Sequence, residues 1–401
     1  MAKNKKKLMI LGAGINQLLG IKKAVDLGYF VITLDFLPHN VGHNYSHQYV
    51  NCSTMDKERV LSIAKELNID GIVTFASDVA TSTVGFVAQQ IGIPGGFATE
   101  AQIMSNKSKF RIHQKGQGLN RPDFIVGSSY EEIEKLLSSL ITPLMFKPVD
   151  TSGSRGISRV CEINSSSCAE AFEIAKRFSY TGTVIVEEFI EGTEVGGDGF
   201  LKDGKLKFAI ITQKHTRHFV VTGHRIPTDL SIGDQERVIE ELNKTCDTIG
   251  YTEGPINYDV IVTNEKITIM EMSPRLGGNG IPMIVERSTG FDIIGTSILF
   301  ALNEDISFPK VSHPKNSCGS LVFGSEQKGV LEHIVAKDEL VEAVPEVFEY
   351  SLNFNIGEVV PSFKHSGNSM GYVLFDCPVP TNYLLLTKTI EKTLNIIVSE
   401  S

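Results

Sequence analysis

Residues 257–275 decide the fold of this chain, and they read NYDVIVTNEKITIMEMSPR. One apolar run at 257–262 and a second at 267–272 flank a polar stretch, which is the pattern of a β-hairpin. If the loop has three residues, 264–266, pairing proceeds outward from Thr263 and the residue that follows the loop. We therefore expect two antiparallel strands joined by a tight turn.

This register places two carboxylates side by side. Asp259 lies directly opposite Glu271, because each is four residues from the pair that closes the loop. Opposite side chains are about 4.5–5.5 Å apart at Cβ, so the two acids repel each other unless a cation bridges them. Hard oxygen ligands of this kind suit Mg²⁺ bound to nucleotide phosphates. Alternation along the strand puts Ser273 and Arg275 on the same side as Glu271.

Two alternatives stay open for this hairpin. A two-residue loop would shift the register by one and separate the two acids. A hairpin whose acids simply face solvent would have no chemistry at all. The predicted metal site therefore depends on the register of the strands.

A glycine-rich loop follows the apolar strand expected at residues 144–148. Glycines let backbone N–H groups converge on phosphate oxygens, and lysine and arginine side chains add positive charge. The loop lacks the spacing of a Walker A motif, and an ordinary surface turn is the alternative. Its candidate phosphate contacts are Lys147, Ser152, Gly153, Ser154, Arg155 and Gly156.

A strand with an acidic end is expected at residues 184–194, which read VIVEEFIEGTE. The edge of a strand beside apolar side chains can pair with adenine through backbone groups, and an acid beyond it can hold ribose hydroxyls. An acidic strand end that faces solvent is the alternative. The candidate nucleotide contacts are Glu187, Glu188, Phe189, Ile190 and Glu194.

The first hundred residues alternate strand and helix signals, with strands expected at 8–11 and 30–34. This order implies an α/β, doubly wound parallel sheet. Gly12-Ala13-Gly14 after the first strand, with Asp35 about twenty residues further on, resembles a dinucleotide fingerprint. Gln17 stands where the third glycine belongs, so we expect a turn without a cofactor. An NAD-dependent oxidoreductase is the alternative from another class.

Composition limits the class of protein. A chain of 401 residues with 41% hydrophobic and 21% charged residues is typical of a globular protein of several domains. The net charge of −9 argues against nucleic acid or an anionic membrane as a partner. No apolar stretch approaches the roughly 20 residues that span a bilayer. Six cysteines without a C-x-x-C pair indicate free thiols in a reducing compartment, so we expect a cytoplasmic protein.

Taken in order, these segments resemble the ATP-grasp superfamily, in its biotin-carboxylase-like branch. The resemblance covers roughly residues 1–310 and implies a division of the whole chain. A Rossmann-like domain is expected at 1–105 and an ATP-grasp domain at 106–310, with a mobile lid at about 115–186. A linker rich in Pro, Ser and Lys at 308–317 leads to a small C-terminal α+β domain at 311–401.

The resemblance also implies roles for individual residues. Residues that match Lys107 and Lys147 contact nucleotide phosphates in that branch. Those that match Glu187, Phe189 and Ile190 meet adenine, and the one that matches Glu194 meets ribose. Those that match Asp259 and Glu271 bind Mg²⁺, and the arginine at the position of Arg275 steadies an acyl phosphate.

The chain departs from the family pattern at two places. Ser273 replaces the usual asparagine two residues after the metal-binding glutamate, and a hydroxyl is a weaker ligand, so water is expected between Ser273 and the metal. After Pro274-Arg275, biotin carboxylases continue with Gln-Val-Glu, whereas this chain reads Leu-Gly-Gly-Asn-Gly at 276–280. Bicarbonate is therefore disfavoured. We expect Asn279 and its glycines to hold the carboxylate or amino group of an acceptor, and a plain tight turn is the alternative.

The implied function is ATP-dependent ligation of a small-molecule carboxylate to an amine, through an acyl phosphate. The implied cofactors are ATP and two Mg²⁺ ions, with Mn²⁺ as a substitute, and the implied assembly is a homodimer. A purine-pathway-like transformylase or carboxylase acting on a ribonucleotide amine is the rival enzyme. A nucleotide-binding regulator without turnover is a further alternative, against which the presence of the two acids and Arg275 argues.

Overall fold

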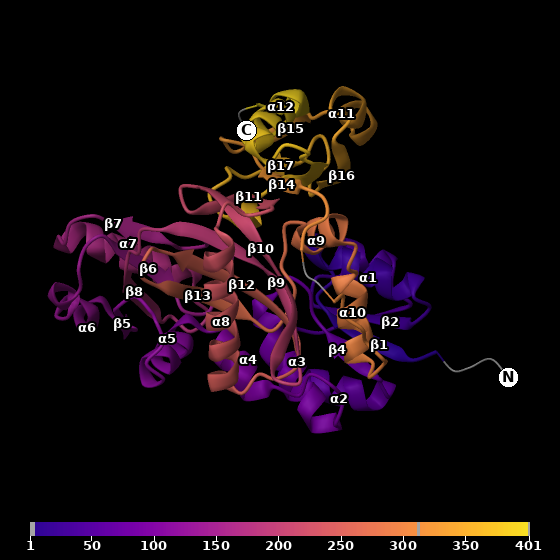
Figure 1. Ribbon diagram of the computed structural model, residues 1–401, viewed down its shortest axis with the longest axis horizontal. Helices are drawn as coiled ribbons and strands as arrows, with labels where there is room; N and C mark the ends of the chain where they lie inside the picture. Colours follow the sequence, from indigo (N-terminus) through magenta and orange to yellow (C-terminus); the bar gives the residue numbers. More distant parts are fainter. Residues whose placement is uncertain (1–4, 311–312, 400–401) are drawn as a thin grey trace.

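The computed structural model describes residues 5–310 and 313–399, and it contains four β-sheets flanked by helices (Figure 1). The α/β and α+β class expected from the sequence is confirmed. Residues 311 and 312 of the predicted linker lie outside the described residues. All six cysteines are free thiols. No helix among the described residues is long and apolar enough to cross a membrane.

The N-terminal sheet is parallel, with strand order β3-β2-β1-β4; one α-helix follows β1 along the chain, one follows β3 and two follow β4. Its strands are β1 (Lys7–Leu11), β2 (Phe30–Asp35), β3 (Gln48–Asn51) and β4 (Gly71–Val73). The helices of this region are α1 (Ile15–Asp26), α2 (Lys57–Leu67), α3 (Asp78–Ile91) and α4 (Ala98–Met104).

A four-stranded antiparallel sheet with order β5-β8-β6-β7 occupies the range predicted for the lid. Helix α5 (Lys107–Gly116) leads into this sheet, and α6 (Tyr130–Glu134) and α7 (Ser165–Phe178) pack on it. Its strands are β5 (Phe124–Gly127), β6 (Leu144–Pro148), β7 (Ser158–Val160) and β8 (Val184–Glu188).

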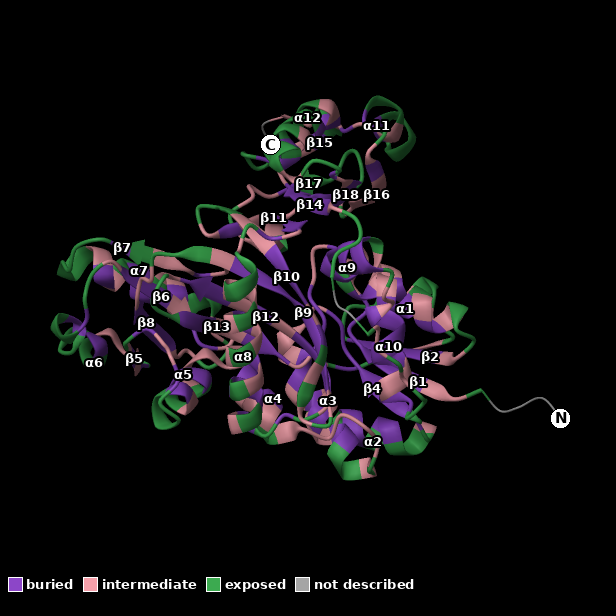
Figure 2. Ribbon diagram, in the orientation of Figure 1, coloured by how far each residue is buried: buried purple, intermediate pink, exposed green. Residues whose placement is uncertain are grey.

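The largest sheet has eight strands in the order β13-β12-β9-β10-β11-β14-β18-β16. Its first five strands are β9 (Thr193–Lys202), β10 (Lys205–Arg217), β11 (Val220–Ile226), β12 (Gly254–Val262) and β13 (Ile267–Ser273). Helix α8 (Ile232–Ile249) lies between β11 and β12 along the chain, and α9 (Ile281–Thr289) and α10 (Ile293–Ala301) follow β13. Figure 2 shows that β9 and β12 are mostly buried, whereas α6 and α7 combine buried, intermediate and exposed residues.

The C-terminal strands continue this sheet rather than form a separate one. They are β14 (Cys318–Phe323), β18 (Gly371–Asp376) and β16 (Val347–Leu352). A small sheet, β17-β15-β19, and two helices cover them. These elements are β15 (Gly329–His333), β17 (Val359–Val360), β19 (Ile397–Ser399), α11 (Lys337–Ala343) and α12 (Tyr383–Leu394). The boundary predicted at 310/311 thus runs between strands of one sheet, and the division into three domains stays a prediction.

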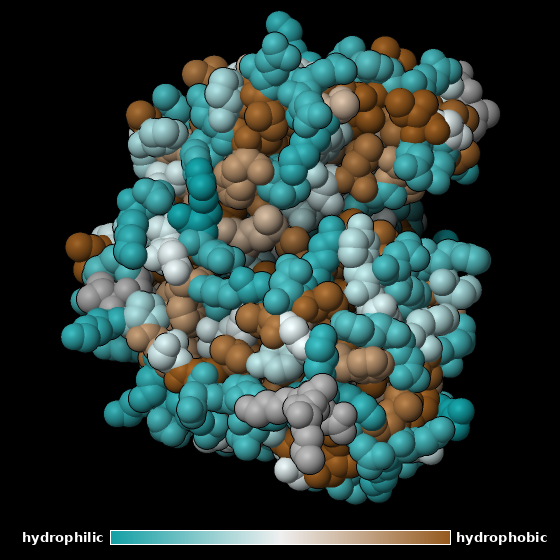
Figure 3. Space-filling view, turned by 90° about the vertical axis from the view of Figure 1, so that its right-hand side faces the viewer, coloured by the Kyte–Doolittle hydropathy of each residue, from teal (hydrophilic) through white to brown (hydrophobic). Residues whose placement is uncertain are grey.

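One apolar core joins the N-terminal sheet to the large sheet. It includes Leu8 and Ile10 of the N-terminal sheet, Phe200 and Phe208 of the large sheet, and Leu374 of β18, all fully or almost fully buried. The face seen in Figure 3 is mostly hydrophilic, with hydrophobic residues scattered among the polar ones. Buried apolar surface therefore fixes the position of the N-terminal sheet against the large sheet.

The β12–β13 hairpin confirms the expected pairing of the two acids, although the expected loop is wrong. The N–H of Thr263 donates to the carbonyl of Lys266 at 2.9 Å, so the loop has two residues and not three. A β-bulge at Met270 then shifts the register back by one. As a result Asp259 lies opposite Glu271.

A glycine in β9 is required by the packing of the large sheet. The hydroxyl of Tyr258 on β12 reaches across β9 and donates to the carbonyl of Ile210 on β10 at 3.0 Å. A Cβ at Gly197 would lie 2.0 Å from that carbonyl oxygen and 2.9 Å from the tyrosine hydroxyl. Any side chain at this position would push the strands apart.

We predict that Gly197→Ala lowers the free energy of unfolding by about 2–3 kcal/mol, as overpacking of a core does. Gly116→Ala is the matched control, because a Cβ at Gly116 meets nothing within 4 Å. The control is expected to leave stability unchanged or slightly raised. Denaturant unfolding of the two variants measures the difference, and equal stabilities would contradict this account of the sheet.

Candidate active site

A pocket of about 820 Å³, including its open mouth, lies between the lid sheet and the β12–β13 hairpin. Its walls combine charged and apolar side chains. Nine of the residues selected from the sequence line it: Lys147, Gly153, Ser154, Glu188, Phe189, Ile190, Glu194, Asp259 and Glu271. Elements far apart in the chain therefore meet at one site.

Lysines from two other elements accompany the paired acids of the hairpin. Lys214 of β10 lies 3.0 Å from Asp259 and 3.8 Å from Glu194. Lys107, at the start of α5, lies 3.0 Å from Glu271 and donates to the carbonyl of Thr151 at 2.6 Å. Burial alone would lower the pKa of Lys214, but the neighbouring Asp259 and Glu194 raise it. Both ammonium groups therefore offset the negative charge of the acids.

Lys147 is held by a fully buried carboxylate. Glu187 has no exposed surface and lies 2.7 Å from both Lys147 and Arg111. Burial would raise the pKa of Glu187, but the two cations lower it to about 2. The Glu187 side chain thus faces the two cations and not the pocket, which leaves only its backbone for the predicted adenine contact. Arg111 was not among the residues predicted from the sequence, although its position as a cation within α5 was a usable signal.

The glycine-rich loop lies between the β10–β11 hairpin and a short 3-10 helix, Ser366–Asn368. The Ser154 hydroxyl donates to the carbonyl of Phe219 at 2.7 Å, and the N–H of Ser366 donates to the carbonyl of Gly153 at 3.0 Å. Three other predicted phosphate contacts of this loop, Ser152, Arg155 and Gly156, do not line the pocket. Arg155 donates to the carbonyl of Ser152 at 3.0 Å, and Gly156 packs against a phenylalanine of α7.

The apolar side chains of the pocket suit an aromatic base. Phe189 carries the guanidinium of Arg159 4.2 Å above its ring and lies 6.4 Å from Phe219. Its N–H donates to the carbonyl of Pro143 at 2.8 Å. Glu188 accepts from the N–H of Ile141 at 2.8 Å, so this side chain supports the lid sheet as well as the pocket wall.

Arg275 belongs to a second group of polar residues at the end of β13. Its Nε donates to Asp78 at 2.7 Å, and its Nη1 donates to Asn257 at 2.8 Å. Ser273 also donates its hydroxyl to Asp78. Burial would raise the pKa of Asp78, but Arg275 and Ser273 lower it. Ser273 therefore shares the Asp78 carboxylate with Arg275 and does not line the pocket of the paired acids; its metal role stays a prediction.

Asp198 fixes the orientation of the Asn257 side-chain amide. It accepts from the amide nitrogen of Asn257 at 2.9 Å and from the N–H of Gly277 at 2.8 Å. The same amide nitrogen also donates to the carbonyl of Gly197 at 2.9 Å, so the amide oxygen of Asn257 is left for Arg275. Burial raises the pKa of Asp198 to about 6 against the effect of these hydrogen bonds.

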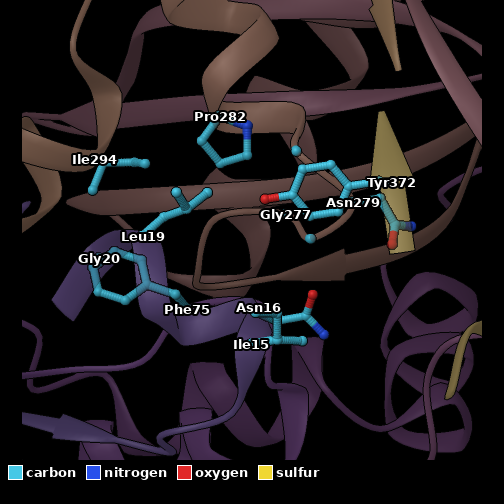
Figure 4. Close-up of a pocket in the computed structure, with 12 residues that line it drawn as sticks. Ile15, Asn16, Leu19, Gly20, Phe75, Gly277, Asn279, Pro282, Ile294 and Tyr372 are labelled. Carbon is cyan, nitrogen blue, oxygen red and sulfur yellow. The ribbon is translucent and has the colours of Figure 1, made fainter. Parts of the chain in front are cut away.

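The glycine loop that holds Asn279 lines a different pocket from the paired acids. Asn279 adopts a φ of 55°, a conformation that asparagine tolerates better than most residues. This second pocket lies on the side of the N-terminal sheet (Figure 4). The paired acids and Asn279 thus line separate pockets, and Arg275 lies next to the glycine loop.

The first glycine-rich turn favours the expectation that no dinucleotide binds there. Asp35 accepts from the N–H of Ala13 and the amide of Asn40, each at 2.9 Å. Gln17 donates to the carbonyl of Phe75 at 2.6 Å and fills the space beside Gly12. The acid that would bind a ribose therefore closes its own turn, which counts against the oxidoreductase alternative.

A lid sheet with its lysine, facing paired acids across one pocket, is the arrangement of an ATP-grasp site. The chain carries an ATP-grasp domain, since the family model of that description matches residues 140–283. This range runs from β6 through the paired acids of the hairpin into α9.

Relatives extend the likeness over most of the chain. An L-arginine-specific L-amino acid ligase of Bacillus subtilis is 24% identical over 348 residues, which are 84% of this chain and 82% of that protein. An uncharacterized protein of Sinorhizobium fredii is 25% identical over 79% of this chain, which spans 66% of that protein's length. The crystal structure of an L-amino acid ligase from Bacillus licheniformis has a TM-score of 0.86 at 21% identity, over 100% of both chains, and shows the same fold.

We predict a specific pH dependence of stability from Glu187. Its folded pKa of about 2 lies below its ordinary value of 4.5, so its contribution is complete above pH 4.5 and is lost as the pH falls toward 2. Each pKa unit corresponds to about 1.4 kcal/mol, which gives a contribution on the order of 3 kcal/mol. Glu187→Gln is expected to lower stability at neutral pH and to flatten its fall in acid.

The exposed Glu191 provides the control, because it lies just beyond the same strand. Glu191→Gln is expected to reproduce the pH profile of the wild type. Unfolding by denaturant between pH 7 and pH 3 compares the three proteins. Parallel profiles for Glu187→Gln and Glu191→Gln would contradict the buried ion-pair account.

Proposed function

We propose that this protein is an ATP-dependent carboxylate–amine ligase that acts on amino acids and releases ADP and phosphate. The observation that carries the proposal is the junction of two sites. Paired acids and lysines, suited to a nucleotide triphosphate, lie beside the Arg275 group and the glycine loop, suited to a small carboxylate. The relatives named as L-amino acid ligases support the choice of substrate.

The paired acids suit a divalent cation bound to phosphates. Asp259 and Glu271 present hard oxygen ligands, and the ammonium groups of Lys214 and Lys107 mark where positive charge is already favoured. No group of three or more His, Cys, Asp or Glu side chains forms a metal site within 5–310 and 313–399, so phosphate oxygens would complete the coordination. Mg²⁺ held there would supply neutralisation of phosphate charge; two ions, with Mn²⁺ as a substitute, belong to the proposal.

The first step joins the substrate carboxylate to the γ-phosphoryl group. A carboxylate oxygen attacks the γ-phosphorus, and the bond to the β-phosphate oxygen breaks, which yields an acyl phosphate and ADP. Lys147 and Lys107 would offset the charge that spreads over the phosphoryl oxygens. Because the buried Glu187 already holds the ammonium group of Lys147, this group needs no reorganisation at the moment of transfer.

The second step forms the new bond to nitrogen. The amine attacks the carbonyl carbon, the bond to the phosphate oxygen breaks, and the amine loses a proton. Arg275 would stabilise the negative charge that develops near the carbonyl and the departing phosphate. Its guanidinium is held by Asp78 on one side and by Asn257 on the other, so it is oriented before substrate binds.

An amino acid fits better than a ribonucleotide amine. A ribonucleotide carries a phosphate, which proteins bind with lysine or arginine side chains. None of the twelve residues that line the pocket beside the glycine loop is charged. The proposal also includes the homodimer and the cytoplasmic location expected from the sequence; light scattering after gel filtration tests the first.

We predict that phosphate release from Mg-ATP appears only with certain pools of amino acids. Glu271→Gln removes one of the paired acids and is expected to lower that rate about 100-fold, the loss typical of a disturbed metal site. Glu265→Gln, at the exposed turn of the same hairpin, is the control and is expected to keep the wild-type rate. Measurable ATP binding with no release in any pool would overturn the proposed ligase.

A further inference from the structure

A second pocket lies between the N-terminal sheet and the glycine loop at 277–280 (Figure 4). It has a volume of about 360 Å³ including its mouth. Its walls come from α1, the turn after β4, the starts of α9 and α10, and β18. The two reaction steps proposed above use none of the residues that line this space.

The walls of this pocket are built by close packing. A Cβ at Gly20 would lie 2.2 Å from the Phe75 ring, so only glycine lets this ring lie against α1. Gln17 of the same helix donates to the carbonyl of Phe75 at 2.6 Å and fixes its backbone. On the opposite side a Cβ at Gly280 would lie 2.5 Å from Leu374. Both walls are therefore held in place by residues behind them.

The lining of this pocket is mostly apolar. Leu19, Phe75 and Ile294 supply apolar surface, and the polar side-chain groups are the amides of Asn16 and Asn279 and the hydroxyl of Tyr372. No Lys, Arg, Asp, Glu or His lines the pocket. A charged group that entered would lose its hydration without gaining a partner, which is costly. The enclosed space is small, so only a small uncharged group fits.

The pocket lies next to the groups assigned to the reaction. The N–H of Ala76 donates to the carbonyl of Leu276 at 3.1 Å, and Arg275 donates to the same carbonyl at 3.1 Å. The turn after β4 and the glycine loop are thus joined backbone to backbone. Phe75 is three residues from Asp78, and Gly277 is two residues from Arg275. A molecule bound in the pocket would therefore touch two segments, the turn after β4 and the glycine loop, that lie within three residues of Asp78 and Arg275.

We infer that this pocket binds the side chain of an amino-acid substrate and selects a small, uncharged, aliphatic one. The amides of Asn16 and Asn279 face the polar atoms of that substrate, and Arg275 and Asp78 lie beyond them. The inference rests on the proposed ligase, and it deepens it by naming the class of amino acid. Leu19 and Ile294 are then specificity-determining residues.

The test widens the pocket by one side chain. Leu19→Ala is compared with Leu18→Ala, which removes the same atoms from the neighbouring position of α1, at similar exposure, without lining the pocket. Ile294→Val, which removes a single methyl group, guards against a misfolded variant. Two readouts are used: the shift in melting temperature with alanine, valine, leucine, lysine or glutamate in the presence of MgADP, and kcat/KM for phosphate release.

The wild type is expected to respond most to alanine or valine, and Leu19→Ala to raise the leucine-to-alanine ratio by about 10-fold or more. Leu18→Ala is expected to keep the wild-type ratio. A strongest response to lysine or glutamate, or equal ratios in the two variants, would overturn the inference while leaving the ligase. Binding of alanine without any phosphate release would overturn the ligase while leaving the pocket's selectivity supported.

Discussion

The repulsion between Asp259 and Glu271 is the constraint on which the rest of the site depends. The bulge in β13 holds the two carboxylates opposite each other, which is unfavourable unless positive charge is near. Lys214 and Lys107 supply that charge from β10 and α5, at 3.0 Å in each case. The hairpin, β10 and the start of α5 therefore meet at this site. The negative charge of bound phosphates would be offset there by the two lysines.

The side chains proposed to act on the substrates are held in place by buried side chains that have no role in the reaction. Glu187 lies between Arg111 and Lys147 without exposed surface, and Asp198 turns the amide of Asn257 toward Arg275. Removing one partner of such a buried pair typically costs about 3–5 kcal/mol, because the other charge is left unpaired. The charged residues of the site are thus tied to the stability of the sheets that carry them.

Sequence patterns predicted the local features and missed the long-range ones. The strands at 8–11 and 30–34 and the β12–β13 hairpin follow from alternation and apolar runs, and they are confirmed. The length of the hairpin loop was wrong because a bulge leaves no sequence signal of its own. Asp78 and Arg275 are 197 residues apart in the chain, so no spacing rule links them, although an acid just after a parallel strand was a usable signal. The partner of the Ser273 hydroxyl, Asp78, was missed for the same reason, and the metal role of Ser273 stays a prediction.

The most direct test of the ligase follows an oxygen atom from the substrate carboxylate. An amino acid that supports turnover is labelled with ¹⁸O in its carboxylate, and the released phosphate is examined by ³¹P NMR or mass spectrometry. Activation as an acyl phosphate predicts one ¹⁸O atom in each phosphate and ADP as the other product. Unlabelled phosphate, or pyrophosphate in its place, would contradict the account.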